Sequence, residues 1–174
     1  MRNINLSNFS NFSPFFHFLQ VAFSDESSFE CSSVRPRRVW TASSSKTPLE
    51  PRLKHPVKVM MWGIMSAEGA GRLHVCEGSM NQHSYLHVLE SRVRPQMEQW
   101  SSAGVNIFMH DSAPCHKARL CTNYLNQINL DVLKWTGNSP DLNPLETHWG
   151  ILKQRLCEYD LPTEQTLIAK IVQL

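Results

Sequence analysis

The chain has 174 residues, 41% of them hydrophobic, which predicts one ordinary globular domain with a single core. No stretch reaches the roughly 20 apolar residues of a membrane span, so we expect a soluble protein with no membrane partner. The apolar opening run could suggest a signal peptide, but Pro14, His17 and Gln20 interrupt it. Five widely spaced cysteines without a C-x-x-C pair indicate reduced thiols in an intracellular compartment and argue against a zinc ribbon.

The net charge of +2 is unevenly distributed along the chain. Residues 31–60 carry seven basic side chains and one acidic side chain, a balance of +6, which leaves −4 for all other residues. Prolines and serines in this stretch indicate an extended connection whose basic groups could follow a phosphate backbone, although a solvated loop explains the pattern equally well. The candidate nucleic-acid contacts are Arg35, Arg37, Arg38, Lys54 and Lys58.

Apolar periodicity predicts elements in the order βββαβαβα, with one further helix at the end. The expected strands span residues 20–29, 55–67, 72–78, 105–113 and 130–135, and the expected helices span residues 81–100, 115–128, 144–156 and 163–174. Glycines in residues 68–72 predict a hairpin turn, and Pro95 should end or kink its helix. This order predicts an α/β fold with a mixed sheet, three antiparallel strands then two parallel, and helices on both faces.

Two of the expected strands end in an aspartate, Asp25 and Asp111, and each aspartate continues the apolar stripe of its strand. The helix that begins after Asn143 has Pro144 at its first position and Glu146 at its third, an arrangement typical of a capped helix start. Functional groups in open sheets gather at the carboxyl ends of the strands. If this helix covers the same face, Glu146 approaches both aspartates.

Three carboxylates at one place need a counter-charge, because like charges repel. Mg²⁺ and Mn²⁺ prefer carboxylate oxygen, and two such ions about 4 Å apart can hold the attacking and leaving oxygens of a phosphodiester. Asp25, Asp111 and Glu146 therefore predict a two-metal site for phosphoryl transfer.

Histidines and a cysteine beside Asp111 allow other interpretations. His110, Cys115 and His116 could form a zinc site or a cysteine nucleophile with a histidine base, but no further group at ligand spacing supports zinc. Local hydrogen bonding by His116 is the favoured interpretation. His83 and His87 lie four residues apart on an expected helix, where a solvated face explains them best.

Four blocks of sequence resemble, in the right order, the catalytic domain of the mariner-like DDE transposases. They read FSDESSFE, VMMWGIMSAEGAGRLHVCEG, FMHDSAPCHKA and WTGNSPDLNPLETHWGILKQRL, and 34 residues separate Asp111 from Glu146, as in one major branch of the family. The resemblance implies a ribonuclease-H-like fold in which Asp25, Asp111 and Glu146 are catalytic and bind two Mg²⁺ or Mn²⁺ ions. It further implies DNA cleavage and joining in the nucleus, a homodimer, no small-molecule cofactor, and a DNA contact from His116.

The sequence also departs from the family pattern. Ser112 stands where the family usually has asparagine, and residues 1–20 form an atypical segment that resembles no part of the family. We expect residues 21–174 to be the catalytic domain, short at its C-terminal end, with the family's N-terminal helix-turn-helix region absent. The alternative is a catalytically idle remnant, or a domesticated module that binds nucleic acid or a partner.

Overall fold

The computed structural model describes residues 18–31, 57–133 and 143–174. These residues divide into two compact units. The first unit contains residues 18–27, 60–133 and 143–147, and the second contains residues 28–31, 57–59 and 148–174. All the acidic residues of the candidate site belong to the first unit.

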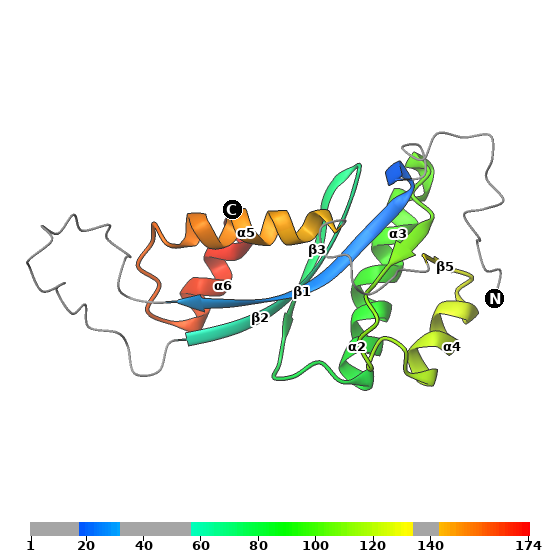
Figure 1. Ribbon diagram of the computed structural model, residues 1–174, viewed down its shortest axis with the longest axis horizontal. Coiled ribbons are helices and arrows are strands. Elements are labelled where there is room, and N and C mark those ends of the chain that lie inside the picture. Colours follow the sequence, from blue (N-terminus) through cyan, green and yellow to red (C-terminus); the bar gives the residue numbers. More distant parts are fainter. Residues whose placement is uncertain (1–17, 32–56, 134–142) are drawn as a thin grey trace, which may run out of the picture. The chain divides into compact units, whose positions relative to one another are not determined.

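Five strands form one mixed sheet in the order β3-β2-β1-β4-β5 (Figure 1). Strands β2 and β3 pair antiparallel, whereas β4 runs parallel to both β1 and β5. This arrangement confirms the predicted α/β class and mixed sheet. The strands are β1 (Val21–Cys31), β2 (Val57–Ser66), β3 (Gly69–Cys76), β4 (Ile107–Met109) and β5 (Asp131–Val132).

The helices follow the predicted order. They are α2 (Gln82–Val88), the π-helical segment η2 (Leu89–Val93), α3 (Arg94–Trp100), the 3-10 turn η3 (Ser101–Ala103), α4 (Arg119–Gln127), α5 (Pro144–Leu156) and α6 (Glu164–Gln173). Pro95 does not end its helix, because it lies in the first turn of α3, where its missing N–H is tolerated. The π-helical turns just before α3 are where the regular α-helical bonding is interrupted.

The predicted hairpin is present between β2 and β3. Gly69 follows the turn with φ +112°, a conformation that favours glycine. Gly71 has a different reason to lack a side chain, since a Cβ there would lie 2.6 Å from Cη2 of Trp100. The hairpin therefore packs closely against α3.

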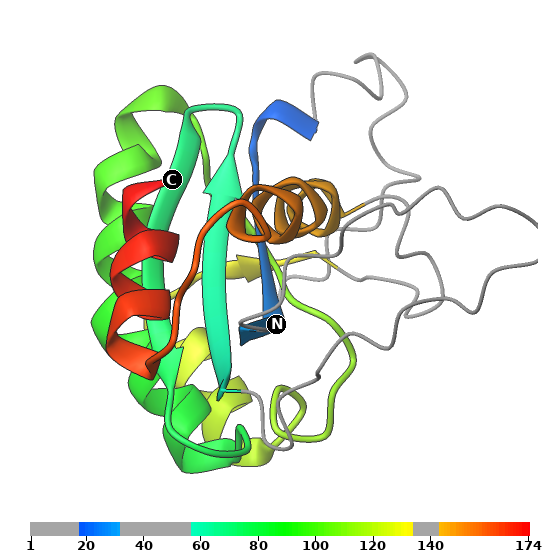
Figure 2. The same ribbon diagram turned by 90° about the vertical axis from the view of Figure 1, so that its left-hand side faces the viewer.

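The core of the first unit lies between the sheet and the helical segment of α2, η2 and α3, which runs along one face of the strands (Figure 2). It includes Ala22 of β1, Phe108 of β4, and Tyr85 and Val88 of α2, none of which has measurable exposure. Even-numbered residues of β1 and β4 thus face these helices. Odd-numbered residues face the other side, where the first turn of α5 begins.

The second unit has its own aromatic contact. The rings of Phe29 and Trp149 meet edge to face with centroids 5.6 Å apart, and Nζ of Lys153 lies 5.5 Å above the Phe29 ring. Leu167 and Ile171 of α6 are buried. Across residues 18–31, 57–133 and 143–174, no helix has both the length and the apolar character needed to span a bilayer.

On either side of Asp111, the predicted element boundaries were wrong. The strand expected over 105–113 ends at Met109, and the helix expected from residue 115 begins at Arg119. Between them the chain turns, because the Asp111 carboxylate accepts the N–H of Ala113 and the carbonyl of Ala113 accepts the N–H of His116. These side-chain and backbone bonds compete with strand and helix pairing.

Candidate active site

The register of two parallel strands brings Asp25 and Asp111 to the same level of the sheet. Phe23 of β1 pairs with Met109 of β4, and each aspartate lies two residues further along its own chain. The expectation that Asp25 ends its strand was wrong, since β1 continues to Cys31. Asp25 nevertheless lies just beyond the carboxyl end of the neighbouring β4, where ligands collect in open sheets.

Ser24 is hydrogen-bonded to two other segments beside the carboxyl end of β4. Its buried hydroxyl donates a hydrogen bond to the carbonyl oxygen of Met109 at 2.9 Å, which joins β1 to the end of β4. Its own carbonyl oxygen accepts a hydrogen bond from Nδ2 of Asn143 at 3.4 Å, which joins β1 to the start of α5. One residue thus links the segments that carry Asp25, Asp111 and Glu146.

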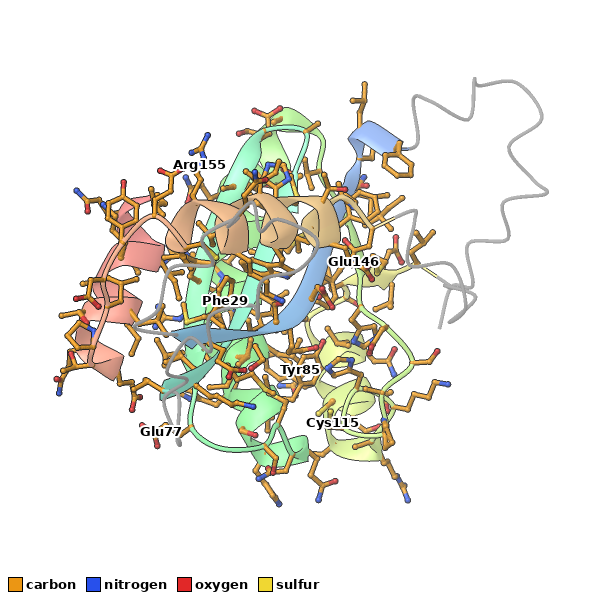
Figure 3. All side chains as sticks on the ribbon, turned by 60° about the vertical axis from the view of Figure 1, so that its left-hand side comes forward. Phe29, Glu77, Tyr85, Cys115, Glu146 and Arg155 are labelled. Carbon is orange, nitrogen blue, oxygen red and sulfur yellow. The ribbon has the colours of Figure 1, made fainter. Side chains whose placement is uncertain are left out.

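Asn143 also caps α5, as predicted. Its Oδ1 accepts the N–H of Leu145 at 3.1 Å, and its carbonyl oxygen accepts the N–H of Glu146 at 3.1 Å. Glu146 is therefore fixed in the first turn, beside β1 (Figure 3). The same asparagine side chain sets the helix start and the distance from that start to Asp25.

The charges that act on Asp25 include those of the other two predicted acids. The pKa of Asp25 is raised from 3.8 to about 6, first by burial and then by the nearby charges of Glu26, Glu146 and Asp111. An N–H from the backbone of Glu26 opposes the shift. The three acids predicted from the sequence thus share one electrostatic environment.

Asp111 differs from Asp25 because it has a cationic neighbour. Its hydrogen bond with His116 lowers its pKa below 3.8, although burial acts in the other direction. Oδ1 accepts both this bond, at 2.6 Å, and the N–H of Ala113 at 2.9 Å. Within the part of the chain that the structure describes, Oδ2 of Asp111 has no hydrogen-bond partner, so it is available to a ligand.

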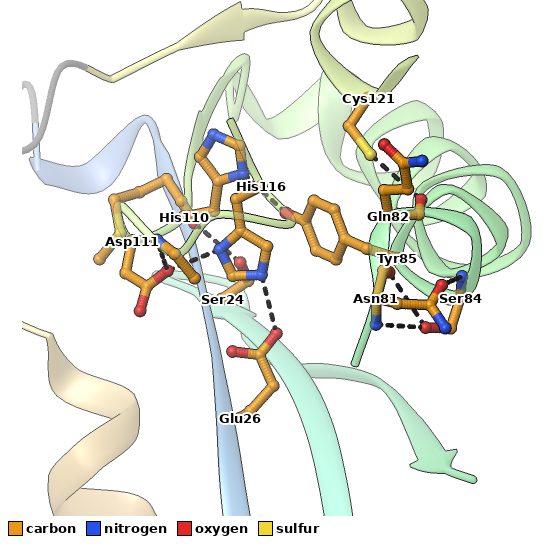
Figure 4. Close-up of polar contacts among 12 residues, drawn as sticks. Ser24, Glu26, Asn81, Gln82, Ser84, Tyr85, His110, Asp111, His116 and Cys121 are labelled. Atoms are coloured by element: carbon orange, nitrogen blue, oxygen red, sulfur yellow. Dashed lines mark hydrogen bonds and ion pairs between the residues drawn. The ribbon is translucent and has the colours of Figure 1, made fainter. Parts of the chain in front are cut away.

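His116 lies behind Asp111 with only 2% of its surface exposed. Nδ1 donates to Oδ1 of Asp111, and Nε2 lies 3.2 Å from Oε1 of Glu26 (Figure 4). Burial lowers the pKa of His116, but the contacts with Asp111 and Glu26 outweigh it and raise the pKa from 6.5 to about 10. His116 is therefore an imidazolium between two carboxylates.

Aromatic rings enclose this imidazolium. The ring of Tyr85 lies 4.0 Å from that of His116, and the His110 ring stacks on it at 5.2 Å with an interplanar angle of 13°. The Tyr85 hydroxyl lies 2.7 Å from Nδ1 of His110, a hydrogen-bond distance. Burial, followed by the charge of His116, lowers the pKa of His110 to about 4, so His110 is neutral.

Glu26, Asp111 and His116 place ligand atoms within 4.8 Å of one another, as a metal site would. The contacts argue against that interpretation, because the two carboxylates meet opposite nitrogens of one ring and the imidazole stands between them. Neither nitrogen of an imidazolium has a lone pair for a metal. The zinc and cysteine-nucleophile alternatives gain no support, and local hydrogen bonding by His116 is confirmed.

Sequence reasoning missed Glu26. The signal was present in the strand alternation, since Glu26 shares the even-numbered face of β1 with Ala22, which packs in the core beside Tyr85. A glutamate on that face needs a buried partner, and His116 is the partner that the structure provides.

The predicted DNA contacts divide into three groups. The burial of His116 does not support a direct contact with DNA. Lys58 is exposed on β2 and lies 3.4 Å from the carboxylate of Glu30. The others lie outside the described residues, namely Arg35, Arg37, Arg38 and Lys54.

Comparisons with known proteins identify the family of this chain. The model of the DDE superfamily endonuclease family matches residues 20–168. The Tc3 transposase of Caenorhabditis elegans is 29% identical over 135 residues, which are 76% of this chain and 41% of the relative. The Tcb1 transposase of Caenorhabditis briggsae is 34% identical over 110 residues, 61% of this chain and 39% of the relative. The matched part therefore spans about two fifths of these relatives.

The crystal structure of the Mos1 mariner paired-end complex with Mn has a TM-score of 0.79 at 21% identity, covering 97% of this chain and 50% of the Mos1 chain. The Mos1 catalytic domain solved with raltegravir and Mg has a TM-score of 0.66 at 18% identity, covering 90% and 70%. These likenesses confirm the ribonuclease-H-like fold. By its family match, its relatives and its fold, this chain belongs to the DDE superfamily endonucleases, as a mariner-like DDE transposase domain.

Proposed function

We propose that this chain cleaves and joins DNA strands by metal-dependent phosphoryl transfer, with Asp25, Asp111 and Glu146 as the catalytic and metal-binding residues. The observation that carries the proposal is the strand register that puts Asp25 and Asp111 at one level, with the bond from Asn143 to Ser24 that brings the start of α5 to the same strand. Carboxylates that repel one another in the absence of a cation form a site that a divalent cation stabilises.

The residues fit Mg²⁺ or Mn²⁺. All three donors are carboxylates, the ligands that these hard ions prefer. Asp111 keeps Oδ2 for a ligand while Oδ1 is held by His116 and the N–H of Ala113. Two ions are proposed, because the family implies two. When bound, they supply Lewis-acid stabilisation of the attacking and leaving oxygens of a phosphodiester.

The chain's own residues supply ligands and their placement. Ser24 and Asn143 hold β1, β4 and the start of α5 together, so that the carboxylates stay close despite their repulsion. Asp111 stays ionised through its bond to His116. A cation must displace the proton of Asp25 at about pH 6 and below, since the pKa of this acid is raised to about 6.

DNA is the proposed partner, and the nucleus is the proposed compartment. Solved Mos1 structures include a paired-end complex with the left transposon end, which supports DNA binding and a homodimer here. The basic residues of the stretch 31–60 are the proposed phosphate contacts, with Lys58 the one that the structure describes.

A nicking assay tests the function. Supercoiled plasmid is incubated with the purified chain and Mn²⁺, and we expect nonspecific relaxation that the isosteric variant Asp111→Asn reduces at least about a hundredfold, because the variant loses one negative ligand. The control Asp160→Asn changes an exposed aspartate of the second unit and should retain wild-type nicking. Equal nicking by wild type and Asp111→Asn would refute the assignment. Absence of both nicking and metal binding by the wild type would favour a catalytically idle remnant.

A further inference from the structure

The structure assigns to Glu26 and His116 the role of a positioning pair, which fixes the Asp111 carboxylate so that only its second oxygen serves as a ligand. This inference rests on the proposed function and adds two residues to it. Neither residue was among the acids predicted to act in catalysis, and neither has to touch DNA or metal.

The first support is the direction of the contacts. His116 meets Asp111 through Nδ1 at 2.6 Å and Glu26 through Nε2 at 3.2 Å, so the imidazole connects the two carboxylates in one chain of contacts. Glu26 belongs to β1 and Asp111 follows β4. The pair therefore fixes Asp111, which lies on a loop, relative to a strand of the sheet.

The second support is the rigidity of the imidazole. Its ring is 98% buried and lies against the Tyr85 ring at 4.0 Å and the His110 ring at 5.2 Å. A buried ring that contacts two aromatic neighbours and meets a carboxylate at each nitrogen cannot turn without breaking these contacts. Oδ1 of Asp111 also accepts the N–H of Ala113, so two donors fix one oxygen and thereby the plane of the carboxylate.

The third support is energetic. Packing alone does not require charged groups here, since a buried ionic cluster is often no more stable than an apolar group of the same volume. Groups that hydrogen-bond to ligating carboxylates orient those ligands, and their removal typically weakens metal binding. Positioning of Asp111 accounts for the cluster, whereas packing by itself does not.

Two substitutions of His116 separate its two contacts. In His116→Asn the amide nitrogen can take the place of Nδ1 and keep the bond to Asp111, while the contact with Glu26 is lost. In His116→Gln the amide nitrogen reaches the place of Nε2 and meets Glu26, while Asp111 loses its donor. We expect His116→Gln to weaken Mn²⁺ binding about tenfold to a hundredfold, and His116→Asn to weaken it about threefold or less.

Mn²⁺ binding is measured on the full chain by electron paramagnetic resonance of the free ion, and folding is followed separately by thermal melting. Glu26→Gln provides a second, nearly isosteric test, in which loss of the charge should weaken Mn²⁺ binding about threefold to tenfold. Its matched control, Glu68→Gln, alters an exposed side chain and should bind Mn²⁺ as the wild type does.

The outcomes distinguish a failure of the positioning pair from a failure of the proposed function. Wild-type binding together with equal affinity in His116→Gln and Glu26→Gln overturns the positioning pair and leaves the proposed function standing. If His116→Asn and His116→Gln lose the same Mn²⁺ affinity and both have lowered melting temperatures, His116 has a packing role. That result also overturns the positioning pair, unless Glu26→Gln loses Mn²⁺ affinity at an unchanged melting temperature. A wild-type chain that binds no Mn²⁺ overturns the proposed function and this inference together.

Discussion

Replacing Asp25 by asparagine should stabilise the metal-free protein. The pKa of Asp25 is raised from 3.8 to about 6 by burial and by the charges of Glu26, Glu146 and Asp111, so the folded state disfavours the ionised form. Asparagine has nearly the same shape and carries no charge. The substitution should therefore remove the repulsion while it also removes a metal ligand.

The size of the stability change follows from the shift in the pKa of Asp25. A rise from 3.8 to about 6 corresponds to about 3 kcal/mol at pH values well above 6, and screening at this half-buried side chain reduces it to about 1–2 kcal/mol. The folded state binds the Asp25 proton more tightly than the unfolded state, so ionisation of Asp25 lowers the free energy of unfolding. This loss of stability is absent below about pH 4, grows as the pH rises, and is complete above about pH 6.

Urea unfolding in the presence of a chelator, followed by tryptophan fluorescence, measures the difference between variant and wild type. We expect Asp25→Asn to be more stable by about 1–2 kcal/mol near pH 7.5, and by about half as much near pH 5. Asp160→Asn, an exposed change of the same chemistry, should show no such difference. A variant less stable than the wild type near pH 7.5, or a stability gain that does not shrink at lower pH, would refute the electrostatic reasoning.

Two further predictions concern packing and DNA affinity. Gly71→Ala should destabilise the fold by about 1–3 kcal/mol in urea unfolding, because its Cβ would lie 2.6 Å from Trp100, whereas Gly150→Ala, with no atom within 4 Å of the new Cβ, should be neutral or stabilising. A stable Gly71→Ala protein would contradict the close packing of the hairpin. Alanine substitution of Arg35, Arg37 and Arg38 together should weaken DNA binding equally at all sequences and flatten its dependence on salt concentration. An unchanged dependence on salt would favour the interpretation of this segment as a solvated loop.

Local sequence rules predicted the framework of the site well. Strand alternation predicted that Asp25 and Asp111 lie close together, and in the register of β1 and β4 each follows the pair of Phe23 and Met109 by two residues. The cap formed by Asn143 placed Glu146 in the first turn of α5. These features depend on residues close in sequence, whose geometry the period of a strand or the first turn of a helix determines.

The contacts behind the site could not be predicted in the same way. Glu26 and His116 meet across 89 intervening residues, and their contact depends on the turn that Asp111 and Ala113 make after β4. No periodic pattern specifies where such a turn directs a side chain. The π-helical segment before α3 was missed for a similar reason, because Pro95 indicates an interruption but not its form.

The alternation along β1 restricts how this strand can change in length. Asp25 lies on the side of Glu146, and its neighbour Glu26 faces His116, so both sides of one strand carry a carboxylate with a proposed role. Losing or gaining a single residue between Val21 and Asp25 would turn each carboxylate to the opposite side. Insertions and deletions should therefore be excluded from this part of β1 in any copy that keeps its activity, even where substitutions at its apolar positions are accepted.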